Sequence, residues 1–199
     1  MDYGIDLSHY NTVNDWNAVR GNNITFALCK ITEGTTFVDQ DAGGHLSGAR
    51  GVGIHGGGYH FARPGSVVDQ VTHFVNTGTP LGIFEPGSLT PVLDVEVSGV
   101  GDAFIAEWIR VIRERTGVKR VMVYANLNFW TNVLHPDQWA GDGVYLWIAR
   151  YNGDPGNPGW AHPRLALHQH SDKGSVPGIP GAVDRNATIV PFGLADLLN

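Results

Sequence analysis

The stretch Thr90-Pro-Val-Leu-Asp-Val-Glu-Val97 is a short apolar, β-branched run that two carboxylates interrupt. Such a run is typical of a strand, in which successive side chains point to opposite faces. Asp94 and Glu96 are therefore expected on one face, with the apolar side chains on the other. Two acids on one face belong either to an edge strand with a solvated outer side or to a pair set for general acid–base work, in which crowding and burial raise one pKa above the other.

Segments of strand and helix character alternate along the chain on both sides of this stretch, as far as residue 140. Strands are expected at residues 3–8, 24–31, 52–61, 90–97 and 120–125, and helices at residues 39–50, 66–78, 102–117 and 127–140, with a short one around Trp16 and Val19. Regular alternation of this kind is the signature of parallel βα units.

The alternation breaks in the last quarter of the chain. Strands are expected at residues 145–151, 165–169 and 183–186, but the links between them are too rich in Pro and Gly for crossover helices. Links of this kind suit antiparallel pairing. The 199 residues also fall short of the ~250 typical of a complete eight-fold barrel. We therefore expect one α/β domain over residues 1–199, a barrel of five βα units followed by three strands without helices.

Composition limits the function. The formal net charge is −6 and no run of Lys or Arg occurs, which argues against nucleic acid as a partner. Cys29 is the only cysteine and lies in an apolar run, so it is expected as a small buried hydrophobe and not as a nucleophile. No apolar run approaches 18 residues, and the first residues lack the basic flank and apolar core of a signal peptide, so membrane insertion is not expected.

Polar or aromatic residues stand at or just beyond the carboxyl end of several expected strands. They are Asp6, Glu33, Tyr59, His60, Asp94, Glu96, Tyr124, Trp147, Arg150, Gln169 and Asp184. Active sites of βα barrels are built at that end, and closing the barrel brings Asp6 and Asp184 near the central pair. Carboxylates around one mouth, with aromatic neighbours and no excess of Lys or Arg, suit a neutral polyol and favour glycoside hydrolysis.

Seven short motifs run through the chain in a fixed order. They are Gly4-Ile-Asp-Leu-Ser8, Lys30-Ile-Thr-Glu-Gly34, Gly58-Tyr-His-Phe-Ala62, Leu93-Asp-Val-Glu96, Val123-Tyr-Ala-Asn126 with Trp130, Leu146-Trp-Ile-Ala149 with Tyr151, and Gly181-Ala-Val-Asp-Arg-Asn186. In this order the chain, from residue 3 to about 190, resembles glycoside hydrolase family 25, the Chalaropsis-type lysozymes of fungi, bacteria and phage. The resemblance implies a flattened, TIM-like (β/α)5(β)3 barrel. It also implies an N-acetylmuramidase without cofactor or metal, which cuts the β-1,4 bond between N-acetylmuramic acid and N-acetylglucosamine in bacterial peptidoglycan.

Carried over by position, the resemblance gives each acid a role. Glu96 is the expected general acid, Asp94 the group that orients and polarises the substrate's 2-acetamido group, and Asp6 and Asp184 shape the electrostatics of the cleft and hold the sugar. The expected substrate-binding residues are Tyr59, Tyr124, Trp147, Gln169 and Arg63. An Asp-x-Glu pair beside an acetamido sugar suggests retention through an oxazoline-like intermediate, while inversion through an activated water stays open.

Some positions depart from the family pattern or stay open. His168 and His170 flank Gln169 where family members often carry aromatic residues, which puts sugar contacts there in doubt. Glu33 lies in a family motif but is interpreted as a structural carboxylate. Arg63 and Arg150 are expected either to pair with carboxylates at the rim or to touch the peptide stem of the substrate.

Three other functions remain as alternatives. The nine His residues suggest a metal-dependent hydrolase, although no His-x-His closes the first strand and no HExxH occurs. A glycan-binding module that has lost catalysis is disfavoured by the intact acid pair. A chitinase-like enzyme shares the Asp-x-Glu chemistry and differs in the substrate that it digests.

The resemblance also suggests a source and a route. A muramidase core without a signal peptide or wall-binding repeats is what the catalytic domain of a phage endolysin shows. We therefore expect a monomer that is made in the host cytoplasm, is released through a holin pore and acts on the bacterial cell wall.

Overall fold

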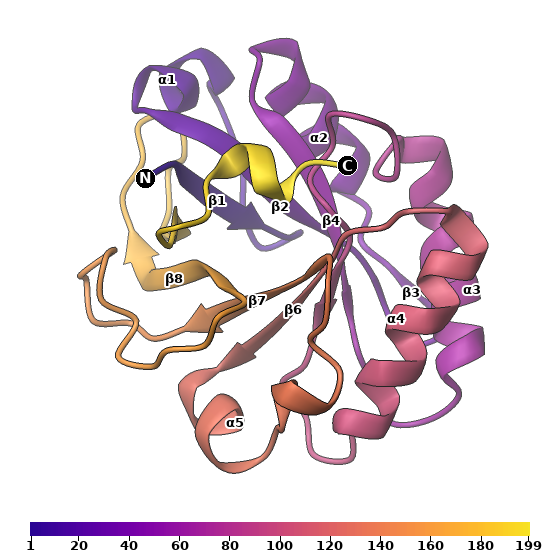
Figure 1. Cartoon of the computed structure of the whole chain (residues 1–199). Coiled ribbons are helices and arrows are strands. Elements are labelled where there is room, and N and C mark those ends of the chain that lie inside the picture. The colour runs from indigo at the N-terminus through magenta and orange to yellow at the C-terminus, as the bar shows by residue number, and fades with distance from the viewer.

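Eight strands close into a barrel in the computed structural model, which describes residues 1–199 (Figure 1). In the order in which they pair, they are β1 (Tyr3–Leu7), β9 (Val183–Thr188), β8 (Leu165–Gly174), β7 (Val144–Ala149), β6 (Val121–Asn126), β5 (Val92–Asp94), β4 (His55–Phe61) and β2 (Ile24–Glu33). Parallel pairing of β1 with β2 closes the ring, and a ninth strand, β3 (Phe37–Val38), forms a short hairpin with the end of β2. The expected α/β barrel is confirmed.

Five α-helices follow the first five barrel strands, and none follows the last three. They are α1 (Trp16–Gly21), α2 (Ala42–Gly51), α3 (Val67–Gly78), α4 (Asp102–Thr116) and α5 (Leu127–Asn132), with 3-10 turns at Thr79–Leu81, Pro136–Gln138 and Leu194–Leu197. Side chains before three of these helices accept a hydrogen bond from the first turn, which starts the helix there: Asp15, Ser66 and Asn126. No helix is both long and apolar enough to cross a membrane.

The expected helix at residues 127–140 is wrong in its second half. α5 ends at Asn132, and Pro136 starts a separate 3-10 turn. Proline offers no N–H to the preceding turn and disfavours helical backbone at the residue before it, so the helix cannot continue through this point. The segment is instead tied to the start of α4, because the Asp102 carboxylate accepts from His135 N at 2.8 Å and from Trp139 Nε1 at 2.7 Å.

The expectation of antiparallel pairing among the last three strands is partly wrong. β8 pairs antiparallel with β9, and β9 with β1, but β7 and β8 run parallel. Their link, residues 150–164, crosses over as an irregular loop. His168 on β8 secures this loop from the outside of the barrel, because its Nδ1 lies 3.0 Å from the Pro155 carbonyl and its Nε2 lies 2.9 Å from the Arg150 carbonyl.

Side chains of the barrel strands alternate between two apolar regions. On β2, Ala27 and Cys29 point outward into the layer beneath the helices, whereas Phe26 and Leu28 point inward and help fill the barrel. Cys29 is fully buried, as expected. Inward-facing residues near the carboxyl ends of the strands are different, because most of them are polar. That polar layer is the floor of the candidate active site.

Candidate active site

A cavity of about 140 Å³ opens at the carboxyl ends of the barrel strands. It is lined by Asp6, Tyr59, Asp94, Glu96, Tyr124, Trp147, Tyr151, Gln169 and Asp184, and we call it the carboxylate cavity. Eight of these nine residues are among the nine that the sequence analysis named as site residues. The ninth, Tyr151, lies two residues beyond the end of β7, where its only signal was a place in one of the seven motifs.

Asp94 and Glu96 lie together on one wall of the carboxylate cavity. Strand β5 ends at Asp94, earlier than expected, so Glu96 stands in the following loop, while Val95 between them is buried in the apolar layer outside the barrel. Asp94 is 5% exposed and its Oδ1 has no hydrogen-bond partner, whereas Glu96 is exposed. Burial, and after it the neighbouring carboxylate of Glu96, raises the pKa of Asp94 well above its ordinary value.

Asp6 and Asp184 form a second acidic pair on the opposite part of the wall. Antiparallel pairing of β1 with β9 sets the two residues directly across from each other. Asp6 Oδ2 accepts from Gln169 Nε2 at 2.8 Å and from Asn186 Nδ2 at 2.7 Å. Burial, followed by the charge of Asp184, raises the pKa of Asp6 well above its ordinary value, and burial also raises the pKa of Asp184. The two acids therefore hold a proton more readily than isolated carboxyls do.

A hydrogen-bond network orients the side chains between these acids. The Gln169 amide oxygen accepts from the Tyr124 hydroxyl at 2.7 Å and from the Tyr151 hydroxyl at 3.1 Å. Because two donors occupy that oxygen, the amide NH2 of Gln169 is the end that faces Asp6.

Asn186 repeats this arrangement on the next strand. Its amide oxygen accepts from Trp147 Nε1 at 2.8 Å while its NH2 group binds Asp6. Asn186 is not among the residues expected in the site from the sequence. Strand alternation on β9 places it on the same face as Asp184, two residues away, and that spacing was the available signal.

Four residues that the sequence singled out do not line the carboxylate cavity: Arg63, Glu33, His60 and Arg150. Arg63, expected to bind substrate there, lines a separate depression, where its Nε donates to Glu33 Oε1 at 2.8 Å. Glu33 also accepts from Lys30 Nζ at 2.6 Å, which agrees with its structural interpretation. His60 is fully buried between the Thr32 hydroxyl at 2.7 Å and Gln70 Oε1 at 3.0 Å, and burial lowers its pKa to about 4.

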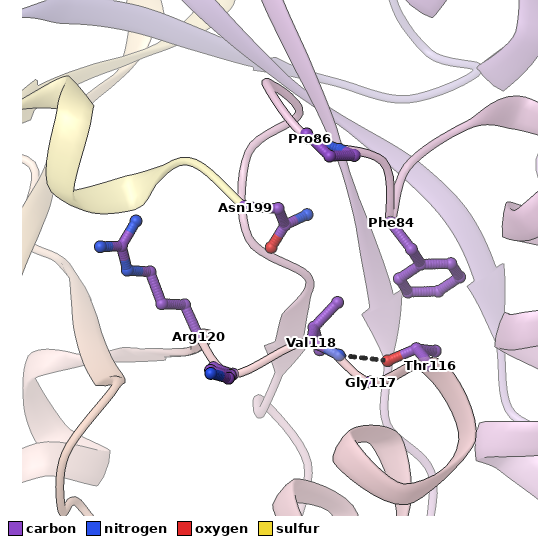
Figure 2. Close-up of a pocket in the computed structure, with 8 residues that line it drawn as sticks. Phe84, Pro86, Thr116, Gly117, Val118, Arg120 and Asn199 are labelled. Carbon is purple, nitrogen blue, oxygen red and sulfur yellow. Dashed lines mark hydrogen bonds between the residues drawn. The ribbon is translucent and has the colours of Figure 1, made fainter.

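A larger cavity, of about 370 Å³, lies at the opposite end of the barrel (Figure 2). It is formed by Phe84 and Pro86 before β5, by the turn from Thr116 to Arg120 before β6, and by Asn199. Figure 2 shows the Thr116 side chain accepting from the Val118 backbone, and Arg120 Nη1 donates to the Leu198 carbonyl at 2.6 Å. No carboxylate side chain lines this cavity. The carboxylate cavity, although smaller, is therefore the candidate site for acid–base chemistry.

The arrangement in the carboxylate cavity suits acid-catalysed cleavage of a neutral substrate. One acid of the Asp94–Glu96 pair is buried and the other is exposed, so the two meet a substrate in different environments. The side chains of Tyr59, Tyr124 and Trp147 complete the lining of the cavity. No group of three or more His, Cys, Asp or Glu side chains is arranged as metal ligands.

Known proteins resemble this chain in both sequence and fold. The family model described as glycosyl hydrolases family 25 matches residues 5–179. Lysozyme M1 of Streptomyces globisporus is 28% identical over 197 residues, which cover 92% of this chain and 66% of that protein. The uncharacterized protein YegX of Escherichia coli O6:H1 is 32% identical over 198 residues, which cover 92% and 68%. The chain thus spans about two thirds of the length of these relatives.

The crystal structure of a lysozyme from Streptomyces coelicolor superimposes with a TM-score of 0.80. That chain is 28% identical, and the alignment covers 98% of this chain and 94% of that one.

Proposed function

Because the chain belongs to glycosyl hydrolases family 25 and is thus a glycoside hydrolase, we propose that it is a peptidoglycan-cleaving muramidase whose reaction takes place in the carboxylate cavity. The observation that carries the proposal is the Asp94–Glu96 pair, one acid buried and one exposed, at the mouth of a barrel that also presents Asp6 and Asp184. The bond cut is the β-1,4 linkage from N-acetylmuramic acid to N-acetylglucosamine.

Glu96 acts as the general acid in this proposal. Its exposed position lets it reach the glycosidic oxygen of a sugar chain that lies across the mouth of the cavity. Departure of the leaving sugar requires a proton on that oxygen, and the Asp94–Glu96 pair holds one because burial raises the pKa of Asp94. When a substrate N–H donates to Asp94, it stabilises the ionised form of Asp94, and the shared proton is then available on Glu96.

Asp94 receives the substrate's 2-acetamido group. Its Oδ1 is buried without a hydrogen-bond partner, which leaves an acceptor at the base of the cavity where an acetamido N–H can bind. Such a contact turns the acetamido oxygen toward the anomeric carbon, so that it attacks as the glycosidic bond breaks. Water, deprotonated by Glu96, then attacks the anomeric carbon of the oxazoline-like intermediate and breaks its bond to the acetamido oxygen, so the product keeps its anomeric configuration. Direct attack by water, with inversion, is the alternative that product stereochemistry distinguishes.

Asp6 and Asp184 stabilise positive charge and hold the sugar. The oxocarbenium-like transition state carries positive charge near the anomeric carbon, and carboxylates on the facing wall lower its energy. Gln169 and Asn186 fix the Asp6 carboxylate by two hydrogen bonds, so little reorganisation is needed during the reaction. Action on the cell wall follows from the proposed substrate, whereas monomeric state and release through a holin stay predictions.

The test is digestion of purified peptidoglycan by wild type and by Glu96→Gln, with the products reduced by borohydride and identified by mass spectrometry. New muramitol ends from wild type, and few or none from Glu96→Gln, are expected. Glu114→Gln, which changes an exposed carboxylate on α4, is the matched control and should behave as wild type.

Three other outcomes would contradict the proposal. New glucosaminitol ends would mean that the enzyme cuts the other glycosidic bond, and digestion of chitin in preference to cell walls would favour a chitinase-like enzyme. No new reducing ends from several walls would favour a glycan-binding module without catalysis.

A further inference from the structure

A second depression, of about 360 Å³, lies between α1 and α2. Its walls are built from residues 11–13 and Trp16, which follow β1, and from four residues between Gln40 and His45, which follow β2. Figure 1 shows α1 and α2 near these two strands. Since Asp6 also lies on β1, this α1–α2 depression and the carboxylate cavity are on the same end of the barrel.

Trp16 gives the depression a rigid aromatic wall. Its indole packs so closely on Gly48 of α2 that a Cβ at Gly48 would fall 2.0 Å from Trp16 Nε1. The contact fixes the ring between the two helices and leaves it half-buried. An aromatic ring held in this way offers apolar area to the C–H face of a sugar ring, whose hydroxyl groups point sideways to polar partners.

Polar groups that lack partners within the protein surround Trp16. His45 is 7% exposed, yet its Nδ1 has no hydrogen-bond partner, which is costly for a buried nitrogen unless a ligand group binds there. Asp41 precedes α2 but makes no capping bond with its side chain, and the neighbouring Gln40 is exposed. No Lys or Arg lines the depression, so its chemistry suits neutral hydroxyl and acetamido groups better than anions.

Tyr10 has an exposed aromatic ring, and in the sequence it falls between Asp6 and the residues of the depression. Tyr10 is 87% exposed, and its ring centroid is 4.1 Å from that of His9. His9 is itself anchored, because its backbone N and its Nδ1 lie 2.8 Å and 3.0 Å from Oδ2 of the buried Asp39. The rim therefore presents a supported aromatic surface over which a polysaccharide can pass.

We propose that the α1–α2 depression is a distal saccharide subsite, which binds an N-acetylated hexose of the same glycan strand whose scissile bond lies in the carboxylate cavity. This rests on the proposed function. The subsite adds affinity for long strands and takes no part in bond cleavage.

Gly44→Met is the variant that blocks the subsite. Gly44 lines the depression, is exposed on α2, and has nothing within 4 Å of an added Cβ, so a side chain enters the depression without strain. Replacing a helical glycine also favours the helix. Gly51→Met is the matched control, because Gly51 is in the same helix, has the same free space and does not line the depression.

Initial rates are compared on long peptide-free glycan strands and on a tetrasaccharide of the same repeat. For each protein we take the ratio of kcat/KM on long strands to kcat/KM on the tetrasaccharide. In Gly44→Met this ratio should be about tenfold lower than in wild type, because KM on long strands rises. A tenfold change corresponds to about 1.4 kcal/mol. Gly51→Met should keep the wild-type ratio. If Gly44→Met keeps the wild-type ratio of the two kcat/KM values, the depression is not a subsite.

A binding measurement separates failure of the subsite from failure of the proposed function. The Trp16 indole N–H resonance is followed by NMR while a soluble hexamer of N-acetylglucosamine is added to wild type and to Gly44→Met. A saturable shift in wild type, lost in Gly44→Met, is expected. If wild type hydrolyses peptidoglycan but Trp16 does not shift, the subsite is wrong. If Trp16 shifts while no wall is hydrolysed, the depression binds saccharide, but the proposed function is wrong and with it the role of the depression as a distal subsite of that reaction.

Discussion

Gln169→Leu removes three hydrogen bonds from the interior of the barrel while keeping a side chain of similar size. Gln169 is buried, donates to Asp6, and accepts from the hydroxyl groups of Tyr124 and Tyr151. Replacement by leucine leaves those three partners in place and removes what they bind. The substitution therefore measures how much the polar layer beneath the carboxylate cavity stabilises the fold.

The three losses differ in size. Tyr124 is 6% exposed, so its hydroxyl cannot turn to solvent, and an unsatisfied buried hydroxyl costs about 1–3 kcal/mol. Asp6 keeps its bond from Asn186 and loses one of two donors, which costs about 1 kcal/mol. Tyr151 is 54% exposed, so water replaces its lost acceptor at little cost. The free energy of unfolding should thus fall by about 2–4 kcal/mol.

Urea unfolding followed by tryptophan fluorescence and circular dichroism measures this loss, with an unchanged m-value as evidence that only stability changed. Tyr151→Phe is the control, because it removes only the exposed donor, and it should lose less than about 0.5 kcal/mol. If Gln169→Leu is within about 1 kcal/mol of wild type, or if Tyr151→Phe is equally unstable, the buried hydrogen bonds of Gln169 do not stabilise the fold as expected.

Two further predictions concern charge and packing on β1. Burial and the Asp184 carboxylate raise the pKa of Asp6, so folding takes up a proton at this residue. The contribution of that proton to stability is complete below the ordinary Asp pKa of about 3.9 and is lost as the pH rises through the folded-state pKa. Asp6→Asn should therefore melt above wild type at neutral pH, and calorimetry should show that advantage shrinking toward acid; an advantage that grows toward acid would contradict the sign. Gly4→Ala should lose about 1–3 kcal/mol in urea unfolding, because its Cβ would fall 2.2 Å from the buried Phe26 ring, whereas Gly21→Ala, with free space around its Cβ, should not be destabilised.

Local patterns in the sequence were sufficient for the barrel and for most of the cavity. Two-residue alternation placed Asp94 and Glu96 on one side, and the rule that barrel strands close on themselves brought Asp6 to Asp184. Both inferences need only the period of a strand and the order of the elements. They succeed even though β5 is shorter than expected, because the backbone stays extended enough for Val95 to be buried outside and its neighbours to face inward.

Contacts between distant segments were not visible in the sequence. Arg63 follows a strand end as the true lining residues do, and only the position of Glu33, 30 residues away, shows that it turns to a different depression. The parallel pairing of β7 with β8 was missed for a similar reason, because a crossover without a helix depends on His168 binding the loop's carbonyls. No local propensity encodes either contact.

The polar network inside the barrel connects the three strands that no α-helix follows. No α-helix follows strands β7, β8 or β9 in the sequence. Those same strands contribute Trp147, Gln169 and Asn186, whose hydrogen bonds join them to one another and to Asp6 on β1. The interior network therefore ties these three strands to the first strand of the barrel, and it holds the Asp6 carboxylate in place. Substitutions in it should then change stability and activity together, whereas substitution of Glu96, which lies beyond the strands and outside the network, should change activity alone.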